Sequence, residues 1–233
     1  MTSITTTTSS LLRTKPLVAA AALGLLALFG NAAHAQATTD SLTGWGVYGD
    51  AVSQSGAITL TTAYLDGDSD QPSNLSGTSA VDIGTLESAA GVGLYGLDLS
   101  AEQYGTEGSL VGQSFAATAG QTLSFDWSFS TLDTLFQDRA FVVIDGAVVT
   151  LATAGTPGAA TQSFNYTFAQ SGTKTLSFGV IDTVDVVGVS SLSVSKLQLV
   201  SAVPEPASTA MMLAGLVLVG VVKARSRRRE YRL

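Results

Sequence analysis

The chain of 233 residues contains no cysteine and a single histidine, His34. Without cysteine the protein has neither disulfides nor thiol chemistry. With no histidine after residue 34, the rest of the chain cannot build a Ser-His-Asp triad, a Cys-His pair or a His-ligated zinc site. Among common hydrolytic mechanisms only a pair of carboxylates, as in glycosidases, remains available. These absences favour a protein that is not an enzyme.

Positive charge is scarce in the middle of the chain. Residues 36–203 contain 16 acidic residues but three basic ones, Arg139, Lys174 and Lys196, for a net charge of −13. Such a surface repels nucleic acid phosphates and anionic lipid. We therefore exclude nucleic acid as a partner and expect a soluble region that attracts divalent cations.

The same region is rich in Gly, Ser, Thr and Ala, and its apolar residues alternate with polar ones along short segments. Alternation of this kind is typical of β-strands with one buried face. It is clearest in the four large apolar residues Leu123, Phe125, Trp127 and Phe129. Asp145-Gly146, between two apolar runs, predicts a hairpin because both turn positions tolerate positive φ.

About nine or ten strands are expected in all. The others are predicted near residues 45–48, 57–63, 81–83, 92–95, 109–116, 164–168, 176–180 and 192–199. The last contains a bulge near Ser195-Lys196, where the alternation shifts by one residue, and residues 86–90 are expected to form a single helical turn. Short strands, glycine-rich turns and no convincing amphipathic helix predict an all-β fold, a two-sheet antiparallel β-sandwich, as one domain over residues 36–202.

The N-terminal segment has the pattern of a secretory signal peptide. Arg13 and Lys15 precede an apolar run over residues 17–29, and Ala33 and Ala35 supply the small residues that signal peptidase recognises. We predict a signal peptide helix over residues 1–35 that is removed, leaving Gln36 at the new N-terminus. The alternative is an N-terminal anchor, but thirteen apolar residues are too short for a stable span.

The C-terminal segment, residues 203–233, has three parts. Val203-Pro204-Glu205-Pro206 is expected to stay extended because proline fixes φ and lacks an N–H group. Residues 207–222 are uncharged and apolar, and they predict a transmembrane helix across a locally thinned bilayer. Under the positive-inside rule the basic end, residues 223–233, stays in the cytoplasm and the preceding domain lies outside. Its basic cluster consists of Lys223, Arg225, Arg227, Arg228 and Arg229.

This tail resembles the PEP-CTERM sorting signal of Gram-negative bacteria in its motif, spacing, short hydrophobic helix and arginine-rich end. The resemblance implies that an exosortase in the inner membrane recognises Pro204, Glu205 and Pro206 and cleaves nearby. The protein would then pass from an inner-membrane intermediate to the cell envelope or the exterior, with signal peptidase and exosortase as processing partners. The alternative, a permanent membrane anchor, explains the helix and the arginines but not the motif.

A second resemblance concerns the domain itself. Glu107-Gly108-Ser109, Ala119 to Trp127, Asp138 to Val142 and Asp145-Gly146 resemble the middle of jelly-roll domains in exported PEP-CTERM proteins and, more distantly, carbohydrate-binding jelly rolls. The resemblance implies a jelly-roll-like sandwich and extracellular polysaccharide as a partner. Five aromatic residues near glycines are candidates to stack on sugar rings, although core packing or scattered surface positions also explain them: Trp45, Tyr48, Tyr64, Tyr95 and Tyr104.

No cofactor is expected apart from a candidate structural Ca²⁺. Asp66, Asp68 and Asp70 alternate in a short loop, a spacing that lets carboxylate oxygens surround calcium. Gln71 and Gly77 stand where an EF-hand requires Gly and Glu, so the segment is at most a generic acidic calcium loop. A solvated turn is the alternative.

Two further interpretations concern carboxylates elsewhere in the domain. Asp182 and Asp185 form a second candidate calcium cluster in a loop before the last strand. Asp126, on the face opposite Trp127, is expected to form a cross-strand ion pair with Arg139 rather than to act in catalysis.

We therefore predict a non-enzymatic exported surface or extracellular-matrix protein with a structural or adhesive role and glycan binding. The main rival is a secreted carbohydrate-active hydrolase that uses paired carboxylates. Most aspartates fall in predicted turns, where water keeps the pKa of a carboxyl low. We expect both members of any such pair to be ionised, which leaves no general acid.

Overall fold

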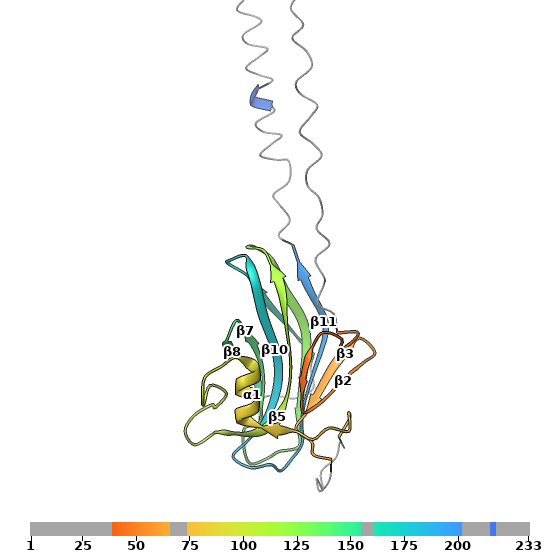
Figure 1. Ribbon diagram of the computed structural model, residues 1–233, viewed down its shortest axis with the longest axis vertical. Coiled ribbons are helices and arrows are strands. Elements are labelled where there is room, and N and C mark those ends of the chain that lie inside the picture. Colours follow the sequence, from red (N-terminus) through yellow and green to blue (C-terminus); the bar gives the residue numbers. More distant parts are fainter. Residues whose placement is uncertain (1–38, 66–73, 155–160, 202–214, 218–233) are drawn as a thin grey trace, which may run out of the picture. The chain divides into compact units, whose positions relative to one another are not determined.

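The computed structural model describes residues 39–65, 74–154, 161–201 and 215–217. Eleven strands in this part of the chain form two antiparallel sheets packed face to face, and one helix, α1, lies among them in sequence (Figure 1). This arrangement confirms the predicted all-β sandwich. No helix among the described residues is long and apolar enough to cross a membrane. The predicted signal peptide lies outside these residues, as does the predicted span over 207–222 apart from residues 215–217.

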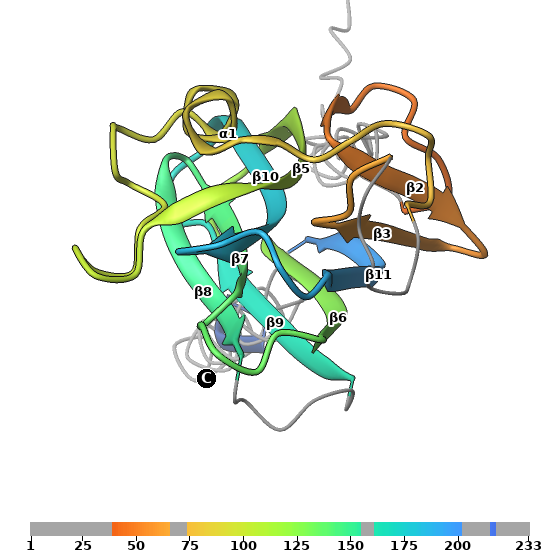
Figure 2. The same cartoon turned by 90° about the horizontal axis from the view of Figure 1, so that it is seen from below.

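The two sheets are drawn as separate layers in the view from below (Figure 2). Sheet A has the strand order β1-β5-β10-β7-β8, with β4 also paired to β5. Its strands are β1 (Gly46–Tyr48), β4 (Val81–Asp82), β5 (Gly105–Ala117), β7 (Arg139–Ile144), β8 (Ala147–Thr153) and β10 (Gly172–Thr183). Sheet B has the order β2-β3-β11-β6-β9. Its strands are β2 (Asp50–Gln54), β3 (Ala57–Thr61), β6 (Thr122–Thr131), β9 (Gln162–Thr167) and β11 (Ser190–Val200).

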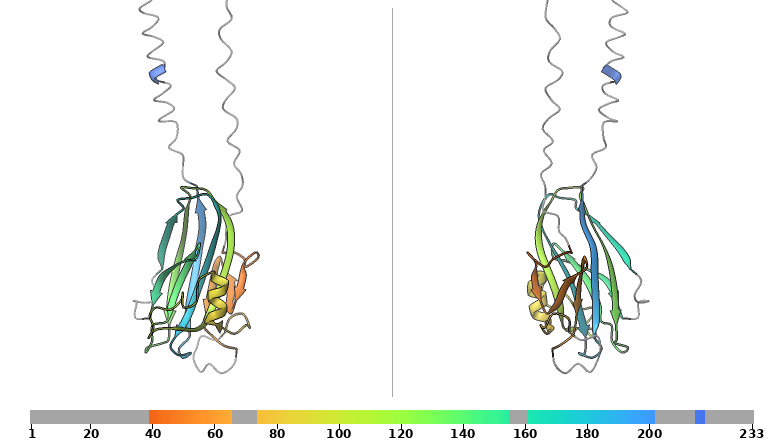
Figure 3. Two further views of the ribbon diagram at one scale, coloured as in Figure 1. Left: turned by 60° about the vertical axis from the view of Figure 1, so that its left-hand side comes forward. Right: turned by 90° about the vertical axis from the view of Figure 1, so that its right-hand side faces the viewer.

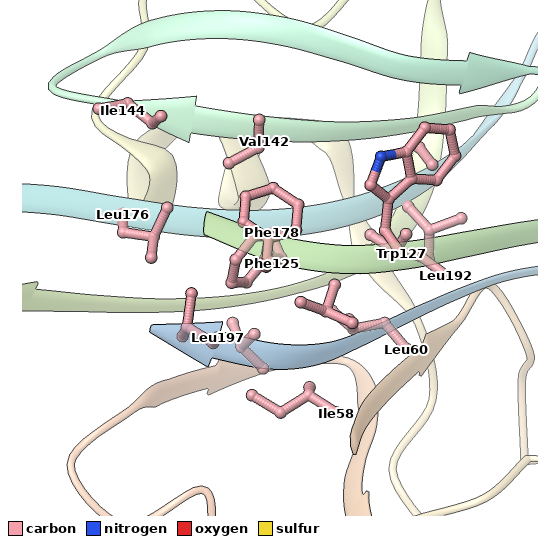
Figure 4. Close-up of a cluster of buried hydrophobic side chains, with 14 of the residues drawn as sticks. Ile58, Leu60, Phe125, Trp127, Val142, Ile144, Leu176, Phe178, Leu192 and Leu197 are labelled. Carbon is pink, nitrogen blue, oxygen red and sulfur yellow. The ribbon is translucent and has the colours of Figure 1, made fainter. Parts of the chain in front are cut away.

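The core between the sheets consists of the inward-facing side chains, which are every second residue along the strands of both sheets. Phe125 of β6 lies at its centre. Its ring stacks on Phe164 of β9 with centroids 4.9 Å apart, and it meets Phe178 of β10 edge-on, also at 4.9 Å. Figure 4 shows Phe125 and Phe178 next to one another among other buried side chains of both sheets. Because β6 and β10 belong to different sheets, this contact joins the two layers. All four apolar residues predicted for the inner face of β6 are buried: Leu123, Phe125, Trp127 and Phe129.

Sheet A has a second buried face, which is covered by the helix α1 (Ile83–Ala90) (Figure 3). The helix begins after Asp82, whose carboxylate accepts a hydrogen bond from the N–H of Thr85, and ends at Gly91 with φ of 69°. It is longer than the single turn predicted over residues 86–90, because the Asp82 cap lets it start earlier. Its buried face joins outer-face residues of sheet A in a second apolar cluster that includes Leu86, Ala90, Leu110, Phe141, Val143 and Ile181.

Two local predictions about backbone conformation are confirmed. Asp145 and Gly146 connect β7 to β8 with φ of 51° and 77°, the left-handed conformations that a tight hairpin turn requires. In β11 the pairing with β6 shifts between Ser195 and Gln198, and Lys196 there has φ of 52°, as expected for a bulge.

Two predictions about strands differ from the structure. Residues 92–95 do not form a strand: they belong to a series of turns in which Gly96 N–H donates to Gly93 O and Asp98 N–H donates to Tyr95 O. Leu94 and Tyr95 are highly exposed, so the apolar residues that suggested a strand have no sheet to join. Conversely, β2 was not predicted because its sequence, Asp-Ala-Val-Ser-Gln, lacks a clear apolar alternation.

The close approach of β5 to β10 gives a testable prediction. A Cβ added to Gly108 would lie 2.0 Å from the carbonyl oxygen of Val180, a backbone atom that cannot turn away. Gly108→Ala should therefore lower the free energy of unfolding by about 2 kcal/mol or more, measured by urea denaturation. Gly93→Ala is the matched control, because nothing lies within 4 Å of its added Cβ. It should change stability by less than about 0.5 kcal/mol. Equal effects of the two substitutions would contradict this account.

Candidate functional site

An open groove of about 540 Å³ lies on the outer face of sheet A beside the end of α1. Its floor follows one row of paired residues across three strands: Gly46 of β1, Gly112 of β5 and Ser177 of β10. Ser114 and Thr175, which are also paired, extend the floor because side chains two residues apart share a strand face. With glycine at two of the three positions in the first row, the floor lies at the level of the backbone.

The walls of the groove come from three separate elements. Tyr48 of β1 stands on one side and is 38% exposed. A Cβ on Gly46 would lie 3.3 Å from Cε2 of Tyr48, so the tyrosine ring leans over this glycine. The end of α1 with Gly91, residues 88–91, and the Asp145-Gly146 turn form the rest of the walls, and Gln113 of β5 completes the lining. The groove therefore offers one aromatic ring beside a floor of small polar residues.

Asp145 is the one carboxylate among the described residues that line the groove. Its Oδ2 lies 2.8 Å from Nζ of Lys174, and its Oδ1 accepts a hydrogen bond from the N–H of Thr175 at 3.0 Å. Although burial acts to raise the pKa of Asp145, the bonds from Lys174 and Thr175 hold it below the ordinary value. The carboxylate is thus ionised and paired, and the groove has little net charge.

The five aromatic candidates from the sequence are dispersed in the structure. Trp45 is buried, with its ring centroid 6.0 Å from that of Phe178, so it belongs to the core. Tyr64 is half-buried, and Tyr95 and Tyr104 are exposed on loops. Tyr48 is the member of this set that lines the groove.

Several predicted sites lie outside the described residues: the candidate calcium ligands Asp66, Asp68 and Asp70, the signal peptidase residues Ala33 and Ala35, the motif Val203 to Pro206 and the basic cluster from Lys223 to Arg229. Within the described ranges, no group of three or more His, Asp or Glu side chains is arranged to hold a metal ion.

The predicted Asp126–Arg139 ion pair is wrong. Asp126 lies on the outer face of sheet B, where it accepts from Nζ of Lys196 at 2.8 Å and from the hydroxyl of Ser163. The Lys196 bond is the main cause of its lowered pKa. Arg139 starts a strand of sheet A, and its guanidinium donates to the carbonyl of Leu97 at 2.9 Å. The two residues belong to different sheets, which strand periodicity does not reveal.

The position predicted for Asp182 is also wrong. It lies in β10 rather than in a loop and is 2% exposed. Because it follows Val180 by two residues, it continues the inner face of the strand to the end of the core. Asp185 lies beyond the strand, where its side chain accepts from Val187 N–H. The two residues therefore do not form a solvated acidic loop.

Sequence reasoning also missed a cluster of three buried carboxyl groups, Glu107, Asp138 and Asp182, at the end of the sandwich where β11 begins. Burial raises the pKa of Asp138 to about 6. Burial, together with the charge of Asp138, raises the pKa of Asp182 to about 10. The expectation that water keeps carboxyl pKa values low fails for these residues. No sequence spacing signals the cluster, since its members come from three distant segments that only the sheet pairing brings together.

Comparison with known proteins identifies the C-terminal tail. Residues 202–229 match the PEP-CTERM protein-sorting motif, which includes Val203 to Pro206 and the basic residues as far as Arg229. The protein thus carries an export signal for exosortase processing at the membrane and delivery to the cell envelope or the extracellular space. No curated protein matches the chain.

Several solved structures match the chain at low similarity. A structure described as "CBM4 structure and function" is 16% identical, covering 69% of this chain and 96% of its own, with a TM-score of 0.32. The N-terminal cellulose-binding domain of β-1,4-glucanase C from Cellulomonas fimi is 15% identical, covering 71% and 94%, with a TM-score of 0.34. A family two carbohydrate esterase from Cellvibrio japonicus is 12% identical, covering 73% and 36%, with a TM-score of 0.33. At these values the matches define neither a ligand nor an activity for this chain.

Proposed function

We propose that the protein is an exported, non-enzymatic surface or matrix protein that binds a neutral polysaccharide in the groove on sheet A. The observation that carries this proposal is the arrangement of Tyr48 beside a floor of glycine, serine and threonine. A sugar ring has an apolar face that stacks on an aromatic ring and a rim of hydroxyl groups that needs hydrogen-bond partners.

The floor of the groove suits a flat, hydroxylated ligand. Gly112 carries no side chain, which lets a ligand ring approach the backbone of β5, while the ring of Tyr48 lies over Gly46 and offers its face for stacking. Ser88, Ser114 and Thr175 are exposed, so their hydroxyl groups are accessible to a ligand in the groove. A volume of about 540 Å³ falls within the range of roughly 300–1,000 Å³ that is common for ligand sites.

Charge favours a neutral polysaccharide over an acidic one. Asp145 is already paired with Lys174, and no described residue that lines the groove offers a free cation for a uronate or sulfate group. The net charge of −13 over residues 36–203 adds repulsion at longer range.

Binding without turnover is supported by the positions of the carboxyl groups. A glycosidase needs two carboxyl groups roughly 5–10 Å apart on either side of an accessible bond. Asp145 is the one carboxylate among the described residues of the groove lining, whereas Asp138 and Asp182, whose raised pKa values would suit an acid, are sealed from solvent. We therefore favour a structural or adhesive role over the rival hydrolase.

The groove assignment is tested by two substitutions and a matched control. Tyr48→Ala removes the stacking ring, and Gly112→Leu fills the floor, because even a Cβ there lies 2.8 Å from Oγ of Ser177. Each should weaken retention by neutral glucans, xylans or mannans in affinity electrophoresis by about tenfold, the equivalent of about 1.4 kcal/mol. Tyr95→Ala, which removes a more exposed ring outside the groove, should leave retention unchanged.

Three outcomes would count against this function. One is retention that falls equally in Tyr95→Ala, and another is the absence of retention by any neutral polysaccharide. The third is release of reducing ends by the wild-type protein that is lost on substitution of one carboxylate pair, which would establish the hydrolase instead. Melting temperatures of all variants separate loss of binding from loss of fold.

The sorting signal is tested independently of the groove. Replacing Pro204, Glu205 and Pro206 with alanine removes the recognition motif but leaves the following apolar run intact, so the protein should accumulate in the inner membrane of an exosortase-positive host. Glu230→Ala, one residue beyond the matched range, is the control and should be processed normally. Cell fractionation measures both, and unchanged release of the triple-alanine variant would defeat the sorting assignment.

A further inference from the structure

The carboxylate of Asp138 connects both sheets at the end of the sandwich where β11 begins, the end that faces the viewer in Figure 2. It accepts hydrogen bonds from the hydroxyl of Ser190 at 2.7 Å and of Thr131 at 3.3 Å, two residues of sheet B. It also accepts from the N–H of Thr183 in sheet A at 3.2 Å. Asp138 is fully buried. A single side chain thus holds the ends of β6, β10 and β11.

Asp182 lies against this carboxylate with the hydroxyl of Thr62 also in hydrogen-bonding reach. It is 2% exposed, and its Oδ1 has no hydrogen-bond partner within the described structure. The other charged groups that act on the pair are acidic: Glu107 of β5 faces Asp182, and Asp133 acts on Asp138. Arg139 follows Asp138 in sequence but directs its guanidinium to the carbonyls of Leu97 and Asp98. No basic side chain of the described residues pairs with Asp138 or Asp182.

Two carboxylates in contact inside a protein cannot both stay ionised, because each charge opposes the other and neither is solvated. One proton must therefore remain on the pair for the sheets to close here. We propose that Asp138 and Asp182 form a proton-dependent clasp, which closes the two sheets at this end and releases the adjoining loops when the proton is lost.

The segments that the clasp controls are the loops over residues 132–137 and 184–189, which flank its members. They are bonded to each other, since Leu132 N–H donates to Val189 O and Gly188 packs against Asp133. Together they expose Leu132, Leu135, Val186 and Val187, with exposed fractions of 47–81%. Opening the clasp would free these loops while leaving the ring contacts of the central core in place.

The direction of the pH effect follows from the raised pKa values. Because both carboxyls bind protons more tightly in the closed state than in the open one, the closed state is favoured at low pH and loses this advantage as pH rises. Over the pH range in which Asp182 is protonated in the closed state and ionised in the open state, the equilibrium constant for opening the clasp should rise by up to tenfold per pH unit. This pH range begins above the ordinary pKa of an aspartate carboxyl group and ends at about pH 10, the raised pKa of Asp182.

The test compares the full chain with Asp182→Asn, which keeps the size of the side chain and mimics its protonated form. Wild-type melting temperature should fall steadily from pH 5 to pH 9, whereas Asp182→Asn should show a much flatter profile and exceed the wild type at pH 9. At pH 8 the amides of Leu132 and Thr183 should exchange hydrogen several-fold more slowly in Asp182→Asn than in the wild type. Glu102→Gln, the same acid-to-amide change at an exposed residue, should retain the wild-type profile.

A wild-type profile that is flat between pH 5 and pH 9 would overturn the proposal, as would an unchanged slope in Asp182→Asn. If that variant does not fold, carbon-13 NMR of the wild-type carboxyl groups gives the answer directly. One carboxyl of the pair should still be protonated at pH 8, and full ionisation of both Asp138 and Asp182 at that pH would rule out the clasp.

Discussion

The contact between Phe125 and Phe178 sets the positions of the features on which function depends. It packs the centre of β6 in sheet B against the centre of β10 in sheet A. Since side chains alternate along a strand, an inward Phe178 places Ser177 on the outer face of sheet A, where it forms part of the groove floor. The same alternation carries the inner face of β10 through Val180 to Asp182, where the core ends in a carboxyl group. The same register of β10 thus places the groove on the outer face of sheet A and the buried acid pair on its inner face.

Features that depend on neighbouring residues could be predicted from the sequence. The alternation of Leu123 to Phe129 defines a strand by itself, and Asp145-Gly146 and Ser195-Lys196 carry their own turn and bulge signals. The helix was underestimated because its apolar face is short and its start depends on the Asp82 cap. The strand predicted over residues 92–95 was wrong because it has no partner strand. Its apolar side chains Leu94 and Tyr95 are exposed on turns.

Features that depend on strand pairing could not be predicted. The groove needs Gly46, Gly112 and Ser177 in one row, which requires the order β1-β5-β10. The ion pair of Asp126 needs β6 beside β11, because that pairing brings Lys196 near, and the sequence offered Arg139 with equal justification. The pKa values of Asp138 and Asp182 likewise depend on burial by segments distant in the chain. The sorting motif, in contrast, is encoded in a contiguous segment and could be predicted from the sequence alone.

The place of β11 in sheet B has a consequence for the order of events during export. This strand is the last of the domain in sequence but the central one of its sheet, paired with β3 on one side and β6 on the other. A chain that emerges from its N-terminus therefore delivers β2, β3, β6 and β9 to the far side of the membrane before the strand that joins them. Until residues 190–200 have crossed, β3 and β6 present unpaired edges to other chains. The sorting motif begins at residue 202, directly after the strand that completes the sheet, so the sorting signal leaves the ribosome only after every strand of the sandwich has been made.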